Sequence, residues 1–231
     1  MNEILRTENI RKDFDKVKVV TGISLSIYED TFTAILGPSG SGKSTLLKLL
    51  SGLIRPTDGQ VWYGDELISA YSEGMLANWK RSEIGNVFQD YLLLDNLTAE
   101  ENIKIGICPN KESLSFDRLT RILQIDDILA KFPAQLSGGQ QQRIAIARAV
   151  IKSPRVLFCD EATGALDEAN SKKVVKLLHN LKSTFGMTIL FTTHNQQIAK
   201  TADRVLTIKD GRLQEDIVNK NPISAADMVW G

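Results

Sequence analysis

The stretch "GPSGSGKST", residues 37–45, has the clearest chemistry in the chain. It fits the spacing G-x-x-x-x-G-K-[ST], in which backbone N–H groups wrap phosphate oxygens, the lysine reaches the β- and γ-phosphates and the hydroxyl residue binds Mg²⁺. These roles fall to Lys43 and Ser44, while Thr45 could contact the α-phosphate. The alternative is a Gly/Ser-rich turn that only caps a helix. A strand-like apolar run before the stretch and a helical pattern after it favour the phosphate-binding loop.

A nucleotide with Mg²⁺ needs a second metal ligand, and two adjacent acids supply a candidate. Asp160 and Glu161 end the apolar run "VLFCDE", at the carboxyl edge of a predicted sheet, where ligands collect. We predict that Asp160 holds Mg²⁺, directly or through water, and that Glu161 orients or deprotonates the attacking water. The alternative is a simple helix cap. The phosphate loop in the same chain favours the metal site.

The sequence around the two histidines and one glutamine predicts the role of each. His194 ends the buried run "TILFTT", so we expect it at the same sheet edge as Asp160, within reach of a γ-phosphate. His179 lies in a helical pattern, off its apolar stripe, and is predicted to be a surface or rim residue without a role. Gln89, in "VFQDYLLLDNLT", is predicted to sense Mg²⁺ or water and to move with the helical region after it. Taken alone, His194 would be a turn histidine and Gln89 a loop glutamine.

A second glycine-rich helix start lies far downstream of the first. "LSGGQQQRIAIARAV", residues 136–150, joins a Ser-Gly-Gly turn to an apolar helix. Backbone N–H groups and the helix dipole make such a start suited to binding an anion. Since the chain already has a complete phosphate loop, the sequence raises the question of what this second start serves.

Short strands and one helical region must position these residues. The first thirty residues alternate apolar and polar, which predicts antiparallel strands, and "TDGQVWYGDEL" predicts a further hairpin strand. "RVLFCDEA", "SKKVVKLLHNLKSTF" and "MTILFTTH" alternate strand, helix, strand, as in a parallel sheet, and "RVLTIKDGRL" predicts a closing hairpin. Residues 71–150 are mainly helical in pattern, and "FDRLTRILQIDDILAKF" places Leu119, Ile122, Leu123 and Ile125 on one face. We expect an α/β fold with an inserted helical subdomain.

Composition narrows the class of protein. The 231 residues suffice for one large domain, and 28 Lys+Arg balance 28 Asp+Glu without a basic block, so no nucleic acid is expected as partner. Cys108 and Cys159 fit neither a disulfide framework nor a zinc site. The amino end lacks an apolar run of signal-peptide length, and no run reaches the ~20 residues of a membrane helix. A cytosolic chain is expected.

Together these residues resemble the ATP-binding subunit of an ABC transporter, from Leu5 to about Leu213. The motifs occur in the family's order: Walker A at 37–45, the Q-loop glutamine at Gln89, the signature "LSGGQ" at 136–140, Walker B at 156–160 with Glu161 next, the D-loop "GALD" at 164–167 and the H-loop histidine at His194. The resemblance implies an α/β fold, with a P-loop NTPase (RecA-like) core, an antiparallel β subdomain and an inserted helical subdomain. Within a single ABC ATPase domain (1–231), residues 1–90 and 151–231 would form the core with the β subdomain, and 91–150 the helical subdomain.

The resemblance also implies cofactors and site residues. ATP and Mg²⁺ are expected, with Lys43, Gln89, Glu161 and His194 as catalytic residues and Ser44, Gln89 and Asp160 at the metal. The nucleotide-binding residues would be Phe14, Gly37, Pro38, Ser39, Gly40, Ser41, Gly42, Lys43, Ser44, Thr45, Gln89, Ser137, Gly138, Gly139, Gln140, Asp160, Glu161 and His194. Phe14 stands where the family places an aromatic residue that stacks on adenine; the alternative is a core aromatic at a strand edge.

In this family two ATP-binding subunits pack head to tail, which answers the question of the second helix start. The signature residues Ser137, Gly138, Gly139 and Gln140 would serve a nucleotide held by the partner, which is expected to be a second copy of this chain. Asp167 would lie at the interface between the two subunits. Each chain then contributes half of each of two sites.

The motifs resemble most closely the group that works with permeases of the macrolide-exporter, lipoprotein-release, antimicrobial-peptide-resistance and cell-division type. Ala162 stands where a proline is usual, Asn195 where an aspartate is common, and Glu29 and Asp30 where Gly-Glu is frequent. None of these replaces a ligand of phosphate or metal.

The resemblance implies a subunit that powers an integral-membrane permease for export or mechanical transmission, peripheral on the inner face of the cell membrane. A groove near residues 91–97 would grip a permease helix. One alternative is an ATP-dependent regulatory subunit of a membrane complex with little substrate transport. Another is a DNA-repair or translation ATPase of the same superfamily, but the coiled-coil, zinc or second ATPase modules usual there are missing from this sequence.

Overall fold

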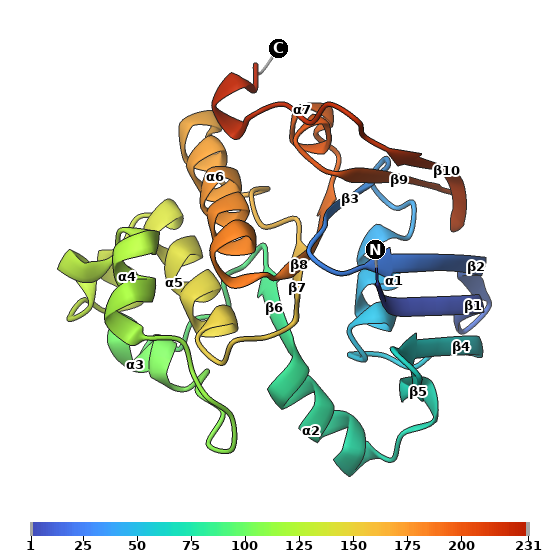
Figure 1. The fold of residues 1–231 in the computed structure, drawn as a ribbon, viewed down its shortest axis with the longest axis horizontal. Helices are drawn as coiled ribbons and strands as arrows, with labels where there is room; N and C mark the ends of the chain where they lie inside the picture. The colour runs from blue at the N-terminus through green and yellow to red at the C-terminus, as the bar shows by residue number, and fades with distance from the viewer. Residues whose placement is uncertain (1, 230–231) are drawn as a thin grey trace.

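A six-stranded sheet forms the centre of the computed structural model, which describes residues 2–229 (Figure 1). The strand order is β10-β9-β3-β8-β7-β6, and neighbouring strands are parallel except β9 and β10. The strands are β3 (Phe32–Leu36), β6 (Ile84–Phe88), β7 (Val156–Asp160), β8 (Thr188–Thr193), β9 (Arg204–Lys209) and β10 (Arg212–Val218). The predicted parallel sheet is confirmed.

The carboxyl ends of four strands meet at one edge of this sheet. Leu36 pairs with Thr193, Thr192 with Asp160, and Asp160 with Phe88, so β3, β8, β7 and β6 end level with one another. The residues that follow these strands therefore leave from the same edge. This confirms the expected common edge for Asp160 and His194.

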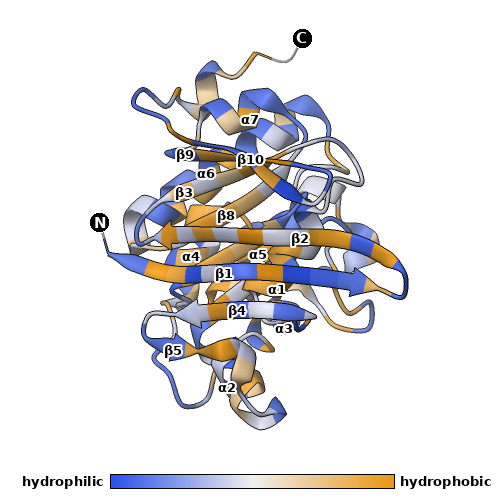
Figure 2. Cartoon of the chain, turned by 90° about the vertical axis from the view of Figure 1, so that its right-hand side faces the viewer, coloured by the Kyte–Doolittle hydropathy of each residue, from blue (hydrophilic) through white to orange (hydrophobic). Residues whose placement is uncertain are grey.

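A second, antiparallel sheet of order β2-β1-β4-β5 covers one side of the first. Its strands are β1 (Glu3–Phe14), β2 (Val17–Tyr28), β4 (Asp58–Tyr63) and β5 (Glu66–Leu67). In β2, Ile23, Leu25 and Ile27 are buried at alternate positions, and Figure 2 shows alternating colours along these strands. The buried side packs with α1 (Lys43–Leu50), which begins within the phosphate loop. The predicted antiparallel strands are thus confirmed.

Helices cover the other face of the central sheet and fill the connections (Figure 1). The helices are α2 (Glu73–Glu83), α3 (Ala99–Lys104), α4 (Phe116–Leu123), α5 (Gly138–Val150), α6 (Glu168–Phe185) and α7 (Gln196–Lys200). Short 3-10 turns lie at Ile68–Ala70, Asp126–Ile128, Pro133–Gln135 and Ala225–Asp227. No helix among residues 2–229 has the length and apolarity needed to cross a membrane.

Two details differ from the helical pattern predicted for residues 71–150. The segment contains β6, and Gly85 in this strand lies close to helix α5: a Cβ there would lie 2.6 Å from the carbonyl oxygen of Ala149. Helix α4 ends at Leu123, since Gln124 adopts a left-handed conformation (φ 53°). The boundaries of the helical subdomain, at residues 91 and 150, stay a prediction.

His179 is half-buried, as a rim residue would be, but it makes packing contacts that were not predicted for it. Its ring stacks on Phe32 with centroids 4.4 Å apart, and its Nε2 lies 3.0 Å from the hydroxyl of Thr201. Burial lowers the pKa of the imidazole. The residue therefore helps to pack α6 against β3, a contact between segments too far apart in sequence for helical periodicity to show.

Candidate nucleotide-binding site

The phosphate loop is held in a conformation that only glycine adopts easily. Gly42, the residue before α1, has φ 101°, and a Cβ on it would lie 2.8 Å from the carbonyl oxygen of Val19 in β2. Gly37 has even less room, since its Cβ would lie 2.2 Å from the carbonyl oxygen of Ile208. The loop is thus packed between the two sheets with its backbone at the carboxyl edge of β3.

Lys43 is enclosed by this loop, with only 4 % of its surface exposed. Its ammonium donates a hydrogen bond of 2.9 Å to the carbonyl oxygen of Pro38 and lies 3.9 Å from a carboxylate oxygen of Glu161. A buried ammonium held by a backbone carbonyl is a fixed positive charge. Lys43 is therefore placed between the phosphate loop and the end of β7.

Asp160 is at the centre of a small network of hydroxyl groups. Its Oδ1 accepts hydrogen bonds from Ser44 Oγ (2.7 Å) and from Thr192 Oγ1 (2.8 Å). The structure thus joins two of the three residues predicted at the metal, Ser44 from α1 and Asp160 from β7. Thr192 was missed by the sequence reasoning, although a polar residue inside the apolar run before His194 is a signal that could have indicated it.

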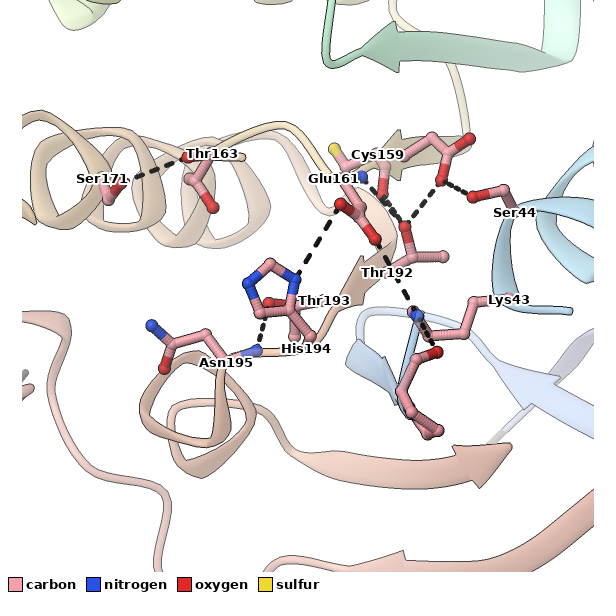
Figure 3. Close-up of polar contacts among 12 residues, drawn as sticks. Lys43, Ser44, Cys159, Glu161, Thr163, Ser171, Thr192, Thr193, His194 and Asn195 are labelled. Carbon is pink, nitrogen blue, oxygen red and sulfur yellow. Dashed lines mark hydrogen bonds and ion pairs between the residues drawn. The ribbon is translucent and has the colours of Figure 1, made fainter. Parts of the chain in front are cut away.

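Glu161 turns the chain at the end of β7. It has φ 45°, unusual for a residue other than glycine, and its N–H donates to Thr192 Oγ1 at 2.9 Å. Its carboxylate lies 3.9 Å from His194 Nδ1 as well as from Lys43, and Figure 3 shows these two side chains approaching it from two sides. Thr192 therefore holds the side chain of Asp160, which is predicted at the metal, and the backbone of Glu161, which is predicted at the attacking water.

A pocket of about 120 Å³ opens beside Glu161. His194, Asn195 and Gly164 help to line it, and the His194 side chain is 67 % exposed. Asn195, where an aspartate is common in the resembling family, donates its backbone N–H to Thr193 and caps α7 through its side chain. The departure at Asn195 thus has a local structural role beside the site.

The residues fit a bound phosphate and a hard cation. Among residues 2–229, Ser41 Oγ is buried without a hydrogen-bond partner, and no atom lies within 4 Å of a Cβ built on Gly40, so the loop has a spare donor and room beside it. Ser44 and Asp160 present oxygen atoms, the ligand type that Mg²⁺ prefers. The site can therefore hold a nucleotide phosphate with Mg²⁺.

Two predicted residues lie around this centre without a contact that tests their roles. Gln89 follows β6 at the same sheet edge, and its side chain lies 3.1 Å from the position of a Cβ on Gly164. Within residues 2–229 no hydrogen bond joins it to Ser44 or Asp160, so its metal role stays a prediction. Phe14 is 46 % exposed at the end of β1, where the ammonium of Lys12 lies 5.2 Å from its ring centre. Exposure counts against the alternative of a core aromatic.

The signature turn is separate from the phosphate loop of its own chain. Ser137 is exposed, and Gly138 and Gly139 begin α5. Their nearest side chains are Tyr91 at Gly138 and Asn170 at Gly139. No hydrogen bond within residues 2–229 connects residues 137–140 with residues 37–45. The structure therefore does not bring the second predicted phosphate site to the first.

Two further groups near the site have shifted pKa values. Burial raises the pKa of the Cys159 thiol, next to Asp160, so this cysteine stays protonated and acts as an apolar residue. The pKa of Asp167 in the D-loop is lowered, chiefly because it accepts the backbone N–H of Asn170. Asp167 is thus a charged cap of α6 close to the signature turn.

Known proteins are similar to this chain in sequence. The model of the ABC transporter family matches residues 20–164. A putative ABC transporter ATP-binding protein of Mycoplasma pneumoniae is 40 % identical over 92 % of this chain and 46 % of its own length. The macrolide export ATP-binding/permease protein MacB of Marinobacter nauticus is 42 % identical over 92 % of this chain and 34 % of its own length. The chain thus spans less than half the length of these curated relatives.

Solved structures agree with the sequence match. The dimeric structure of MJ0796, a bacterial ABC transporter cassette, superimposes with a TM-score of 0.85 at 32 % identity, over 94 % of this chain and all of that one. A dimeric post-hydrolysis state of MJ0796 with ADP and Pi gives the same TM-score at 30 % identity. The chain belongs to the ABC transporter family. It is an ATP-binding cassette with the P-loop NTPase fold.

Proposed function

We propose that this chain is the subunit that powers a membrane permease, working as a head-to-tail pair of identical chains with two MgATP between them. The observation that carries the proposal is the separation of the signature turn from the chain's own phosphate loop. A helix start that is suited to an anion but makes no hydrogen bond to the chain's own phosphate loop is useful if a second copy supplies the phosphate. The dimeric form of the MJ0796 cassette supports this arrangement.

The side chains at the sheet edge divide the work of hydrolysis. Lys43, fixed by Pro38, supplies positive charge to the phosphates, and Ser44 and Asp160 would hold Mg²⁺, which neutralises phosphate charge when bound. Glu161 orients water and takes its proton. His194, on the other side of that carboxylate, is placed to donate a hydrogen bond toward the γ-phosphate. Catalysis by such a site is mostly positioning and charge stabilisation.

An apolar surface beside Gln89 is the proposed contact with the permease. Leu92 and Leu94 are 55 % and 47 % exposed, and Ile105 and Ile107, after α3, are 52 % and 41 % exposed. Exposed apolar side chains grouped in this way mark sites of protein contact. The relatives named macrolide export ATP-binding/permease proteins join both parts in one protein, which supports an integral-membrane permease as partner, export or mechanical transmission as the task, and a place on the inner face of the membrane.

The Glu161→Gln variant tests the ATPase and the pairing together. Loss of the carboxylate should slow ATP hydrolysis by a factor of about 10²–10⁴, since a general base is removed while the phosphate loop is intact. The variant should still bind ATP and should run as a dimer with MgATP on a sizing column. A variant that stays monomeric at high protein concentration would contradict the pairing of isolated chains.

The partner is tested by capturing tagged Glu161→Gln protein from detergent-solubilised membranes with MgATP and identifying bound proteins by mass spectrometry. Recovery of an integral membrane protein with few helices and a large external domain supports a transporter of the transmission type. Recovery of a membrane-bound enzyme or kinase instead would support a regulatory role. Ribosomal or DNA-bound proteins without a membrane protein would contradict the transporter assignment and leave the ATPase chemistry unaffected.

A further inference from the structure

Helix α5 holds the loop after β6 through one arginine. Arg148, near the end of the helix, donates from Nη1 to the carbonyl oxygen of Leu92 (2.5 Å) and from Nη2 to that of Tyr91 (2.8 Å). Burial lowers the pKa of the guanidinium, and no carboxylate within residues 2–229 forms an ion pair with it. The two carbonyl groups are therefore the main polar partners of Arg148 in the described part of the chain.

The two residues that Arg148 holds have an unfavourable backbone. Tyr91 and Leu92 have φ 59° and 50°, in the left-handed region that residues with a Cβ rarely adopt. Such a conformation persists where the surroundings determine it. A bidentate guanidinium on the two successive carbonyl groups is a contact of that kind. Arg148 is thus positioned to keep residues 91 and 92 in this turn.

The same loop also touches the other end of α5. The hydroxyl of Tyr91 lies 2.8 Å from the position that a Cβ on Gly138 would occupy, in the signature turn. Leu92, in contrast, points its side chain outward and is 55 % exposed. One short segment therefore contacts the start of α5, the end of α5 and the exterior.

We propose that Arg148 and Tyr91 are positioning residues that latch residues 91–92 to both ends of α5, so that the exposed loop and the signature turn move together. This inference rests on the proposed function, in which the loop meets the permease and the signature meets the partner's ATP. The connection is direct: the loop that carries the exposed Leu92 contacts Gly138 through Tyr91. A rigid helix held at two points transmits a displacement of either end.

Arg143 on the same helix provides a matched control. It also donates to backbone carbonyl groups, those of Leu123 (3.2 Å) and Gln124 (2.8 Å) and, one turn back in its own helix, that of Gly139 (3.3 Å), and burial likewise lowers its pKa. Its partners outside α5 lie at the end of α4 rather than in the loop after β6. Replacing Arg143 therefore removes similar hydrogen bonds but leaves those between Arg148 and residues 91–92 in place.

The test uses a nitroxide label on Leu92→Cys in the Glu161→Gln chain. Cys108 and Cys159 are buried (6 % and 0 % exposed), so an exposed Cys at residue 92 takes the label, and the chain without it is the blank. MgATP should drive dimerisation, seen on a sizing column, and change the mobility of the label. Arg148→Met should dimerise but lose this change, whereas Arg143→Met should keep it. A response in Arg148→Met equal to that of the parent would overturn the latch, as would a parent that dimerises without any response.

Two milder variants keep the inference testable if Arg148→Met fails to fold by circular dichroism. Arg148→Lys keeps the charge but cannot hold both carbonyl groups in one fork, and Tyr91→Ala removes the contact with Gly138. Each should reduce the response of the label by more than half. A full response in both would overturn the proposal. Failure of the parent to dimerise with MgATP would instead count against the proposed function.

Discussion

The two glycine-rich helix starts of this chain are built in different ways. The phosphate loop leads into α1 through Gly42, which offers no side-chain cap, and Ser41 and Lys43 are both 4 % exposed. The signature leads into α5 through Ser137, whose hydroxyl accepts the N–H of Gln140 (3.4 Å), while the side chain of Gln140 accepts the N–H of Ser137 (2.9 Å). The first start has no side-chain cap and is buried at residues 41–43; the second begins at the exposed Ser137 and is capped by its own residues.

The difference shows which start is sufficient by itself. An enclosed loop with uncapped N–H groups and a buried lysine can surround an anion within one chain. The second start has a capping box that pairs the N–H groups of Ser137 and Gln140, and Ser137 faces outward, so it is suited to an anion presented from outside. Its long hydrogen bond from Gln140 is easily given up. The comparison predicts that substitutions in the two starts have different consequences.

Gly42→Ala should have the largest effect on stability. The variant must place an alanine at φ 101° with its Cβ 2.8 Å from a backbone oxygen, so we expect a loss of roughly 1–3 kcal/mol or more in the free energy of unfolding. Urea denaturation measures it, and loss of ATP binding should accompany it. An unchanged unfolding free energy would mean that the enclosed loop is more adaptable than its packing indicates.

Ser137→Ala should cost less, because it removes only a helix cap. Loss of such a cap lowers the unfolding free energy by about 0.5–2 kcal/mol. ATP binding by the isolated chain should not change, since Ser137 is outside the chain's own phosphate loop. Equilibrium dialysis at low protein concentration checks the second point, and weakened binding there would contradict the separation of the two starts.

Gly138→Ala should leave stability nearly unchanged, within about 0.5 kcal/mol. Its Cβ meets the hydroxyl of Tyr91 at 2.8 Å, the end of a side chain that can move aside, and alanine favours the helix. Dimerisation with MgATP should nevertheless weaken in the Glu161→Gln background, which analytical ultracentrifugation can measure. If Gly138→Ala destabilises as much as Gly42→Ala, the signature turn is as confined as the phosphate loop.

Asp167 caps a third helix start, that of α6. Replacing it with asparagine should have the smallest effect on the free energy of unfolding, and this effect should depend on pH. The folded pKa of Asp167 is lowered by the N–H of Asn170, so its stabilisation is present above the unfolded pKa and is lost as the pH falls through the folded value. The difference in stability between the native chain and Asp167→Asn should therefore shrink in acid. A difference that stays constant from pH 7 down to acid unfolding would contradict the charged cap.

The sequence predicted the parts of the site that follow strands. Motifs and predicted strand ends together indicated that Lys43, Ser44, Asp160, Glu161 and His194 lie close to one another, because parallel strands end at one edge of the sheet. The sequence could not show Thr192 as the link to Asp160, since that contact depends on strand register. The stacking of His179 on Phe32 and the hold of Arg148 on Tyr91 and Leu92 likewise depend on segments brought together only by packing.

Complementation between two inactive chains tests the central claim most directly. Lys43→Ala should disable the phosphate loop and Ser137→Arg the signature, so each variant alone should hydrolyse no ATP. In a head-to-tail dimer of the two, the intact loop of one chain meets the intact signature of the other. An equal mixture should then recover up to about a quarter of the native rate, because half of the dimers are mixed and each has one of its two sites intact. A mixture as inactive as its components would contradict a signature that serves the partner's nucleotide.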